Sequence, residues 1–144
     1  MSTQQCGDIK RANAVTAFDR FLSVANGKGF SQVLLMVFAG KEGRDPKSAT
    51  SDLMVDFSLK PLMYVDKPLA TITSFLSLLE DSLENGKPWD LLFVTALDAD
   101  KFSPSQVNER LELMVRYIHQ GETERFLIFN YQGDVVNLNK TAVH

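Results

Sequence analysis

The sequence contains little of the chemistry on which many enzymes and metal sites depend. It has a single cysteine, Cys6, so no internal disulfide can form, and we expect a reduced, cytoplasmic location. The two histidines, His119 and His144, lie far apart in the sequence, and no Cys/His cluster has the spacing of metal ligands. We therefore expect no cofactor, and a hydrolase built on a histidine base is disfavoured.

A long apolar run and an excess of charge of one sign are also absent. The longest apolar run, Val33 to Ala39, is far shorter than the roughly 20 residues that a membrane-spanning helix needs. Residues 1–10 are polar and lack the apolar segment of a leader peptide. Fifteen Lys and Arg against eighteen Asp and Glu give a net charge of −3, which disfavours general nucleic-acid binding. We expect no contact with a membrane.

The composition supports one folded domain. Hydrophobic residues make up 44% and charged residues 23% of the 144-residue chain, which is typical of globular proteins. The length suits one compact core. We expect a single α/β domain over residues 1–144, with a disordered tail at residues 1–8 and a mobile loop at residues 40–51.

Apolar residues recur at three- and four-residue steps in three segments, which predicts amphipathic helices. These segments are residues 9–25, 69–85 and 103–121. Gly27 and Gly86 end the first two, because glycine readily adopts the conformation that follows a helix. The third begins with Ser103, Pro104 and Gln106, a capping box with proline at the first helical position.

Short apolar runs predict the strands. Gln32–Ala39 and Asp90–Leu97 are apolar on both faces, which is typical of buried central strands. Leu53–Leu59 alternates like a half-buried strand, and Leu62–Val65 continues the sheet at an edge beyond Pro61. A helical turn between Ser48 and Phe57 is the competing interpretation. Two further strands, Arg125–Tyr131 and Val135–Leu138, form a hairpin around residues 132–134.

The alternation of strands and helices predicts a mixed, mainly parallel sheet with three helices packed on it and a C-terminal antiparallel hairpin at the edge. In such a sheet, Val33–Ala39 and Leu91–Leu97 run in the same direction side by side. Ligands usually bind beyond the carboxyl ends of such strands. The loop at residues 40–51 and the turn at residues 98–103 are therefore the first places to look for a site.

Two carboxylates, Asp98 and Asp100, stand at the end of the second buried strand. Side chains at this spacing can share Mg²⁺, which prefers oxygen ligands. The alternative is that acidic residues are simply favoured before a helix by its dipole, and that Asp is a common turn residue. The motif is short, so this second interpretation is favoured.

The stretch WDLLFVTALDADKFSPSQVNERLEL resembles the strand, Asp-x-Asp and helix of Toprim domains, and VLLMVFAGKEGRD resembles the first strand and Gly-Lys turn of that family. The resemblance implies a Mg-dependent nucleic-acid enzyme, intact or degenerate, centred on Asp98 and Asp100. Toprim domains carry a glutamate at the end of the first strand, where this sequence has Ala39. Glu42 comes too late in the sequence to occupy that position.

The loop at residues 40–51 combines glycines with Lys41, Arg44 and Lys47. Glycine-rich turns expose backbone N–H groups and cations add charge, which favours a small anion or a nucleotide. The spacing is not that of a P-loop, and Glu42 and Asp45 oppose the cations. A solvated surface loop is the alternative.

Several residues indicate protein contacts. Trp89 and Tyr131 flank turns, and partly exposed aromatic residues are enriched at interfaces, although both could instead close the core. Val135 and Val136 are apolar on both faces of an edge strand, which indicates a covered edge. Such an edge, or the one at Leu62–Val65, could pair with another chain. We therefore expect a small binding or regulatory module that acts through protein contacts or self-association rather than as an enzyme.

Overall fold

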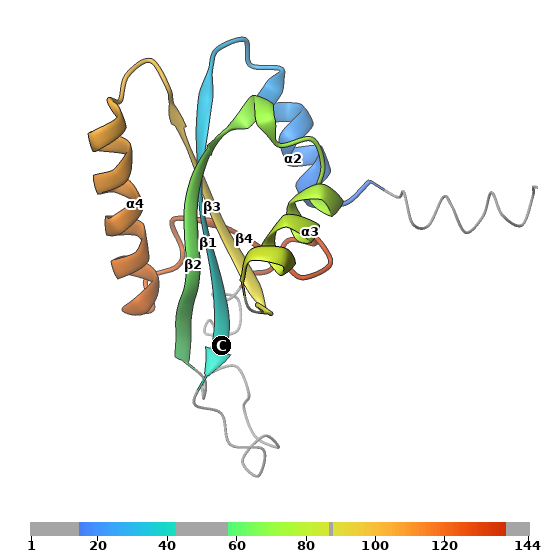
Figure 1. Ribbon diagram of the computed structural model, residues 1–144, viewed down its shortest axis with the longest axis vertical. Helices are drawn as coiled ribbons and strands as arrows, with labels where there is room; N and C mark the ends of the chain where they lie inside the picture. Colours follow the sequence, from blue (N-terminus) through green and yellow to red (C-terminus); the bar gives the residue numbers. More distant parts are fainter. Residues whose placement is uncertain (1–14, 43–57, 87, 138–144) are drawn as a thin grey trace, which may run out of the picture.

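The computed structural model describes residues 15–42, 58–86 and 88–137. In this part of the chain, three α-helices and four strands form an α/β fold of three layers (Figure 1). In chain order the elements are α2 (Ala17–Asn26), β1 (Gln32–Glu42), β2 (Ser58–Pro68), the 3₁₀ turn η3 (Leu69–Thr71), α3 (Phe75–Asn85), β3 (Leu91–Asp98), α4 (Pro104–His119) and β4 (Leu127–Asn130).

The prediction of a mainly parallel sheet is wrong. The four strands lie in the order β2-β1-β3-β4, and every neighbouring pair is antiparallel. In the register of β1 with β3, Gln32 faces Asp98 and Ala39 faces Leu91. Both β2 and β3 run opposite to β1, so they are parallel to each other, and β1 lies between them. The helix α3 therefore makes a split β–α–β connection.

Both faces of the sheet are covered by helices, which explains the apolar runs of its two central strands. The helices α2 and α3 pack on one face and α4 packs on the other (Figure 1). The even-numbered residues of β1, such as Met36, join the cluster under α2 and α3. The odd-numbered ones, such as Val37, join the cluster under α4. A central strand of an antiparallel sheet can thus be as apolar as a parallel one.

The start of α4 agrees with the prediction from its capping residues. Its capping box is confirmed, since the hydroxyl of Ser103 accepts from the backbone N–H of Gln106 and the Gln106 side chain accepts from Ser103. The predicted helix at 69–85 is two pieces, because Ser74 caps a new start at Phe75. In the first helix, Thr16 caps α2, and residues 9–14 lie outside the described part.

The strands also differ from the prediction in their bounds. β1 continues past Ala39 to Glu42, and β2 runs through Pro61 with a register shift opposite Phe38/Ala39. The edge position predicted for Leu62–Val65 is confirmed. The second half of the C-terminal hairpin is a single bridge between Phe129 and Val135. Residues 43–57, which include most of the predicted loop, the start of the alternating strand and the helical-turn alternative, lie outside the described residues, as do residues 1–8 and Leu138.

The beginning and the end of the described chain are joined at the α2 face. The backbone N–H of Phe18 donates to the carbonyl of Gly133 over 3.0 Å. The ring of Phe18 also meets that of Phe129 edge-on, with ring centroids 5.0 Å apart. The α2 helix is thereby fixed to β4 and to the turn that follows it. No helix in the described ranges has both the length and the apolar character needed to cross a membrane.

Candidate functional site

The outer edge of β2 is the longest unpaired strand edge among the described residues, since β2 pairs only with β1. Two hydrogen bonds fix which backbone groups of β1 face β3. The N–H of Asp90 donates to the carbonyl of Ala39 over 2.9 Å, and the N–H of Ala99 donates to the carbonyl of Ser31 over 2.9 Å. In an antiparallel ladder the direction alternates, so odd-numbered residues of β1 face β3 and even-numbered ones face β2.

This alternation identifies the backbone groups that β2 leaves open. The even-numbered residues 34, 36 and 38 of β1 pair with Lys67, Val65 and Met63. The N–H and C=O groups of the intervening Tyr64 and Asp66 are therefore directed away from β1. Pro61 and Pro68 flank this stretch, and neither has an N–H to offer. The regular part of the edge thus presents the backbone groups of Tyr64 and Asp66 between two prolines.

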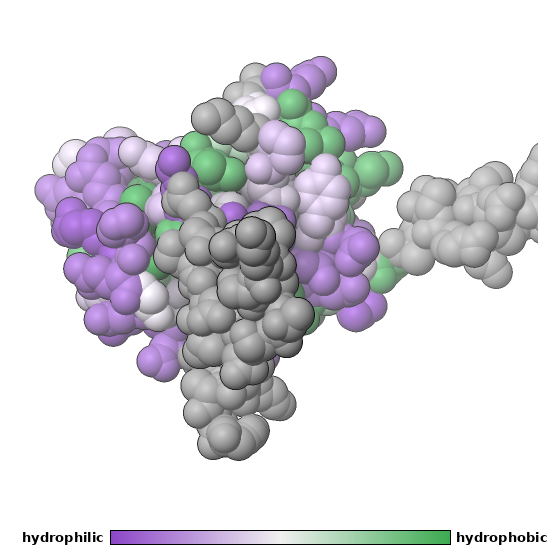
Figure 2. Space-filling view, turned by 90° about the horizontal axis from the view of Figure 1, so that it is seen from below, coloured by the Kyte–Doolittle hydropathy of each residue, from purple (hydrophilic) through white to green (hydrophobic). Residues whose placement is uncertain are grey.

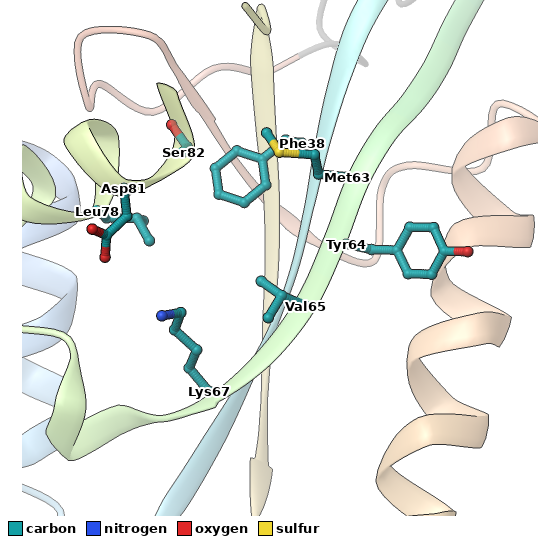
Figure 3. Close-up of a pocket in the computed structure, with 8 residues that line it drawn as sticks. All are labelled: Phe38, Met63, Tyr64, Val65, Lys67, Leu78, Asp81 and Ser82. Carbon is teal, nitrogen blue, oxygen red and sulfur yellow. The ribbon is translucent and has the colours of Figure 1, made fainter. Parts of the chain in front are cut away.

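A cavity of about 300 Å³ opens beside this edge, between β2 and α3 (Figure 3). The residues that line it are mainly apolar: Phe38, Met63, Tyr64, Val65, Lys67, Leu78, Asp81 and Ser82. Figure 3 shows that Val65 and Lys67 extend from β2 towards the α3 side, whereas the Tyr64 ring points to the α4 side. The cavity therefore lies on the face of the sheet that receives the odd-numbered side chains of β2.

The inner wall of the cavity is fixed by a buried polar pair. The indole N–H of Trp89 donates to the hydroxyl of Ser82 over 2.8 Å, and both side chains are buried. The same hydroxyl donates to the carbonyl of Leu79. The ring of Trp89 packs edge-on against Phe38, with centroids 5.2 Å apart. Because buried polar groups without partners are costly, this arrangement holds α3 at a defined distance from β1.

The antiparallel order separates the two places where a ligand was first expected. Asp98 lies opposite Gln32 at one end of β1, and Lys41 and Glu42 lie at the other end. This separation is about 30 Å at roughly 3.3 Å per residue. The described start of the loop therefore does not lie beside the turn at 98–103, as the parallel sheet implied.

Asp98 and Asp100 form part of a turn. A carboxylate oxygen of Asp98 accepts from the backbone N–H of Asp100 over 2.9 Å, as in an Asx turn before a helix. Asp98 is half-buried and Asp100 is exposed. Within the described residues, no group of three or more His, Cys, Asp or Glu side chains is placed to hold a metal ion.

The cations nominated for anion binding are only partly described. The backbone N–H of Lys41 donates to a carboxylate oxygen of Asp90 over 2.8 Å, and the Lys41 side chain is exposed. Arg44 and Lys47 lie outside the described residues. Of these three cations, only Lys41 belongs to the described part of the chain, so anion binding by the three stays a prediction.

The residues nominated for protein contacts have different surroundings. Trp89 is only 3% exposed and belongs to the core, while Tyr131 packs against it and is 38% exposed. Val135 is exposed, and Val136 packs against the cluster under α4. Because the N–H of Val136 donates to the carbonyl of Ile128, the outer side of β4 is partly occupied by the chain itself.

Sequence reasoning identified the β2 edge but missed the cavity beside it. The cavity depends on α3 residues Leu78 and Asp81, which come into place only through the split connection. Pro61 and Pro68 indicate the edge, because prolines are tolerated in a sheet mainly at an edge or a bulge, but they do not indicate the cavity.

Comparison with known proteins does not assign a family. No protein-family model matches the sequence, and no curated protein and no solved structure matches the chain. The outer surface over α4, seen on the left of Figure 2, is mainly hydrophilic.

Proposed function

We propose that this protein is a binding module that takes up an extended segment of a partner protein by adding it as a strand to the outer edge of β2. The observation that carries the proposal is the position of the cavity directly beside the open backbone groups of Tyr64 and Asp66. In strand addition, backbone hydrogen bonds supply affinity and pockets for alternate side chains supply specificity. The β2 edge offers both components.

The register of an added strand follows from β2. A partner strand that bonds to Tyr64 and Asp66 places one residue directly opposite Val65. Residues opposite one another in a sheet direct their side chains to the same face, so this residue points towards α3 and the cavity. The lining of Phe38, Val65 and Leu78 favours an apolar side chain there. The proposed partner motif is therefore a short extended segment with a bulky apolar residue at its centre.

A partner segment fits this site better than a second copy of the chain. In a symmetric pairing of two β2 edges, the side chains offered to each cavity would be Met63, Val65 or Lys67 of the other copy. Met63 and Val65 already pack against the core of their own chain. They are therefore not free to fill the cavity of a neighbour, and the charged side chain of Lys67 does not match its mainly apolar lining.

The test uses a displayed library of random ten-residue peptides selected on the full chain. Asp66→Pro removes the outward N–H of Asp66, and proline is tolerated at an outward edge position. The matched control is Asp66→Ala, which removes the same carboxylate but keeps the N–H. Selected peptides should bind Asp66→Pro about tenfold more weakly than Asp66→Ala. One backbone hydrogen bond is worth about 1 kcal/mol, and the proline ring also displaces the added strand.

A second variant tests the cavity separately. Val65→Phe fills the space from the β2 side while leaving the outward N–H groups in place, so it should also weaken the selected peptides, and their sequences should share one bulky apolar position. Equal binding to Asp66→Pro and Asp66→Ala, or a selection without any binder, would overturn the proposal. So would a wild-type dimer in sedimentation that becomes a monomer in Asp66→Pro, since the second copy would then be the occupant.

The proposed location is the cytoplasm. A chain with one cysteine, Cys6, cannot form an internal disulfide, so an oxidising compartment would not stabilise it in this way. This supports a compartment in which thiols stay reduced. Fractionation of cells that express a tagged chain checks this, and recovery in a secreted fraction would contradict it.

A further inference from the structure

A second cavity, of about 270 Å³, lies on the opposite face of the sheet, between α4 and β3. Its deepest residues are apolar, and Leu35 and Met114 are almost completely buried. Its outer residues include Tyr117 and two exposed arginines, Arg110 and Arg125. The cavity thus has an apolar interior and a cationic opening.

The cavity exists because β4 is shorter than β3. β4 pairs with β3 only from Leu91 to Val94. Beyond Val94 the segment that leads into β4 leaves the sheet, and Arg125 and Phe126 pass beside α4 instead. Thr95 and Leu97 therefore have no strand beside them on the β4 side among the described residues, and the space above them stays unfilled.

Both arginines are held by aromatic rings. The guanidinium carbon of Arg110 lies 5.0 Å from the ring centroid of Phe102, and that of Arg125 lies 4.1 Å from the ring centroid of Tyr117. A cation–π contact orients the guanidinium plane but leaves its N–H groups available at the edge. No carboxylate in the described ranges forms an ion pair with either arginine.

We propose that this cavity binds a small organic anion that consists of an apolar body and a phosphate or carboxylate group. The apolar body would occupy the space above Leu35 and Met114, and the anionic group would lie at the opening against Arg110 and Arg125. Guanidinium groups bond such anions through paired N–H donors. Among the described residues no Asp or Glu lines the cavity, although the chain as a whole carries a net charge of −3, so the described opening is positively charged. The site is separate from the β2 edge.

Nuclear magnetic resonance titration of the full chain tests this inference with four probes. Phenyl phosphate and benzoate carry both parts of the proposed ligand, inorganic phosphate carries only the anion, and benzyl alcohol carries only the apolar body. Phenyl phosphate or benzoate should shift the backbone amide signals of Thr95, Leu113 and Tyr117, and the tighter of the two identifies the anionic group. Inorganic phosphate and benzyl alcohol should each bind at least tenfold more weakly.

Variants of the arginines separate this site from general charge attraction. The double variant Arg110→Gln with Arg125→Gln should bind the tighter-binding probe at least tenfold more weakly than the wild type does. The matched control is Arg116→Gln, which removes one exposed positive charge from the same helix outside the cavity. Binding that survives the double variant, an equal loss in Arg116→Gln, or no response to phenyl phosphate and benzoate at millimolar concentration would overturn the proposal. Equal binding of inorganic phosphate would overturn the apolar part of it.

Discussion

The backbone N–H of Phe75 donates to a carboxylate oxygen of Asp19 over 2.8 Å, which joins the start of α3 to the first turn of α2. The other oxygen of Asp19 accepts from the backbone N–H and the hydroxyl of Thr16. The first N–H groups of a helix have no partner within it and carry partial positive charge. One carboxylate therefore stabilises the beginnings of two helices, and it positions α3 beside the β2 cavity.

Replacing this shared carboxylate should be costly. We expect Asp19→Ala to lower the free energy of unfolding by about 2–3 kcal/mol, since both helix starts lose an acceptor. Urea denaturation measures the change. The control is Glu80→Ala, an exposed carboxylate on α3 without a hydrogen bond among the described residues, which should cost less than about 0.5 kcal/mol. Equal effects of the two variants would show that the bridge between the helices contributes nothing.

Ser82→Ala should destabilise the wall of the β2 cavity by about 1–3 kcal/mol, because the buried indole N–H of Trp89 loses its partner. Trp89 is the single tryptophan, so its fluorescence reports unfolding directly. Ser77→Ala on the same helix is the control. In a Trp89→Phe background there is no indole to satisfy, and most of the cost of Ser82→Ala should disappear. A cost that is unchanged in that background would contradict the role of this hydrogen bond.

Gly133→Ala and Gly29→Ala form a matched pair. Both glycines have φ of +83°, which costs an L-residue roughly 1–2 kcal/mol. A Cβ at Gly29 would meet nothing within 4 Å, whereas one at Gly133 would lie 2.8 Å from the Cβ of Thr16. We expect Gly133→Ala to lower the free energy of unfolding by at least about 1 kcal/mol more than Gly29→Ala does, because the added Cβ overpacks against Thr16 at the start of α2. Thermal unfolding measures the difference. A smaller loss than in Gly29→Ala would show that the turn can move away from α2.

Ser103→Ala removes the capping hydroxyl of α4 and should cost about 1 kcal/mol of unfolding free energy. Ser105→Ala, at an exposed position in the same turn, changes the same kind of side chain without removing a cap. It should be nearly neutral. Calorimetry on the pair gives the difference directly, and a larger effect of Ser105→Ala would show that the first turn of α4 is stabilised in another way.

The ends of the helices were predictable because they depend on neighbours in the sequence. Ser103, Pro104 and Gln106 define the start of α4 within a few residues, and the structure places it there. The break before Phe75 was missed, although Ser74 is a good capping residue. The apolar pattern continues across residues 69–85, so spacing alone does not reveal the 3₁₀ turn and the new start.

The direction of the strands was not predictable in this way. An apolar run such as Leu91–Leu97 shows that both faces of a strand are buried, and it does not show which way the neighbouring strand runs. Here the burial comes from α4 on one side and from α2 and α3 on the other. The helix α3 does join two parallel strands, β2 and β3, but β1 is inserted between them. The alternation of strands and helices therefore indicates two parallel strands, but these strands are not adjacent in the sheet.

The candidate sites share this limit. An edge at Leu62–Val65 was predictable from Pro61, because the constraint of proline on the backbone is local. The two cavities are not local. One cavity requires α3 to lie over β2, and the other requires β4 to begin opposite Val94. Neither arrangement can be predicted from the sequence of the residues that line the cavity.

The hydrogen bond from Phe18 to Gly133 has a consequence for how the protein matures on the ribosome. Of the described elements α2 is synthesised first, but the carbonyl that accepts from the N–H of Phe18 belongs to one of the last described residues. Until Gly133 leaves the exit tunnel, α2 lacks this anchor and the β4 side of β3 is bare. A nascent chain stopped before residue 127 would therefore remain incompletely folded, and quality control would meet it as a target for proteolysis.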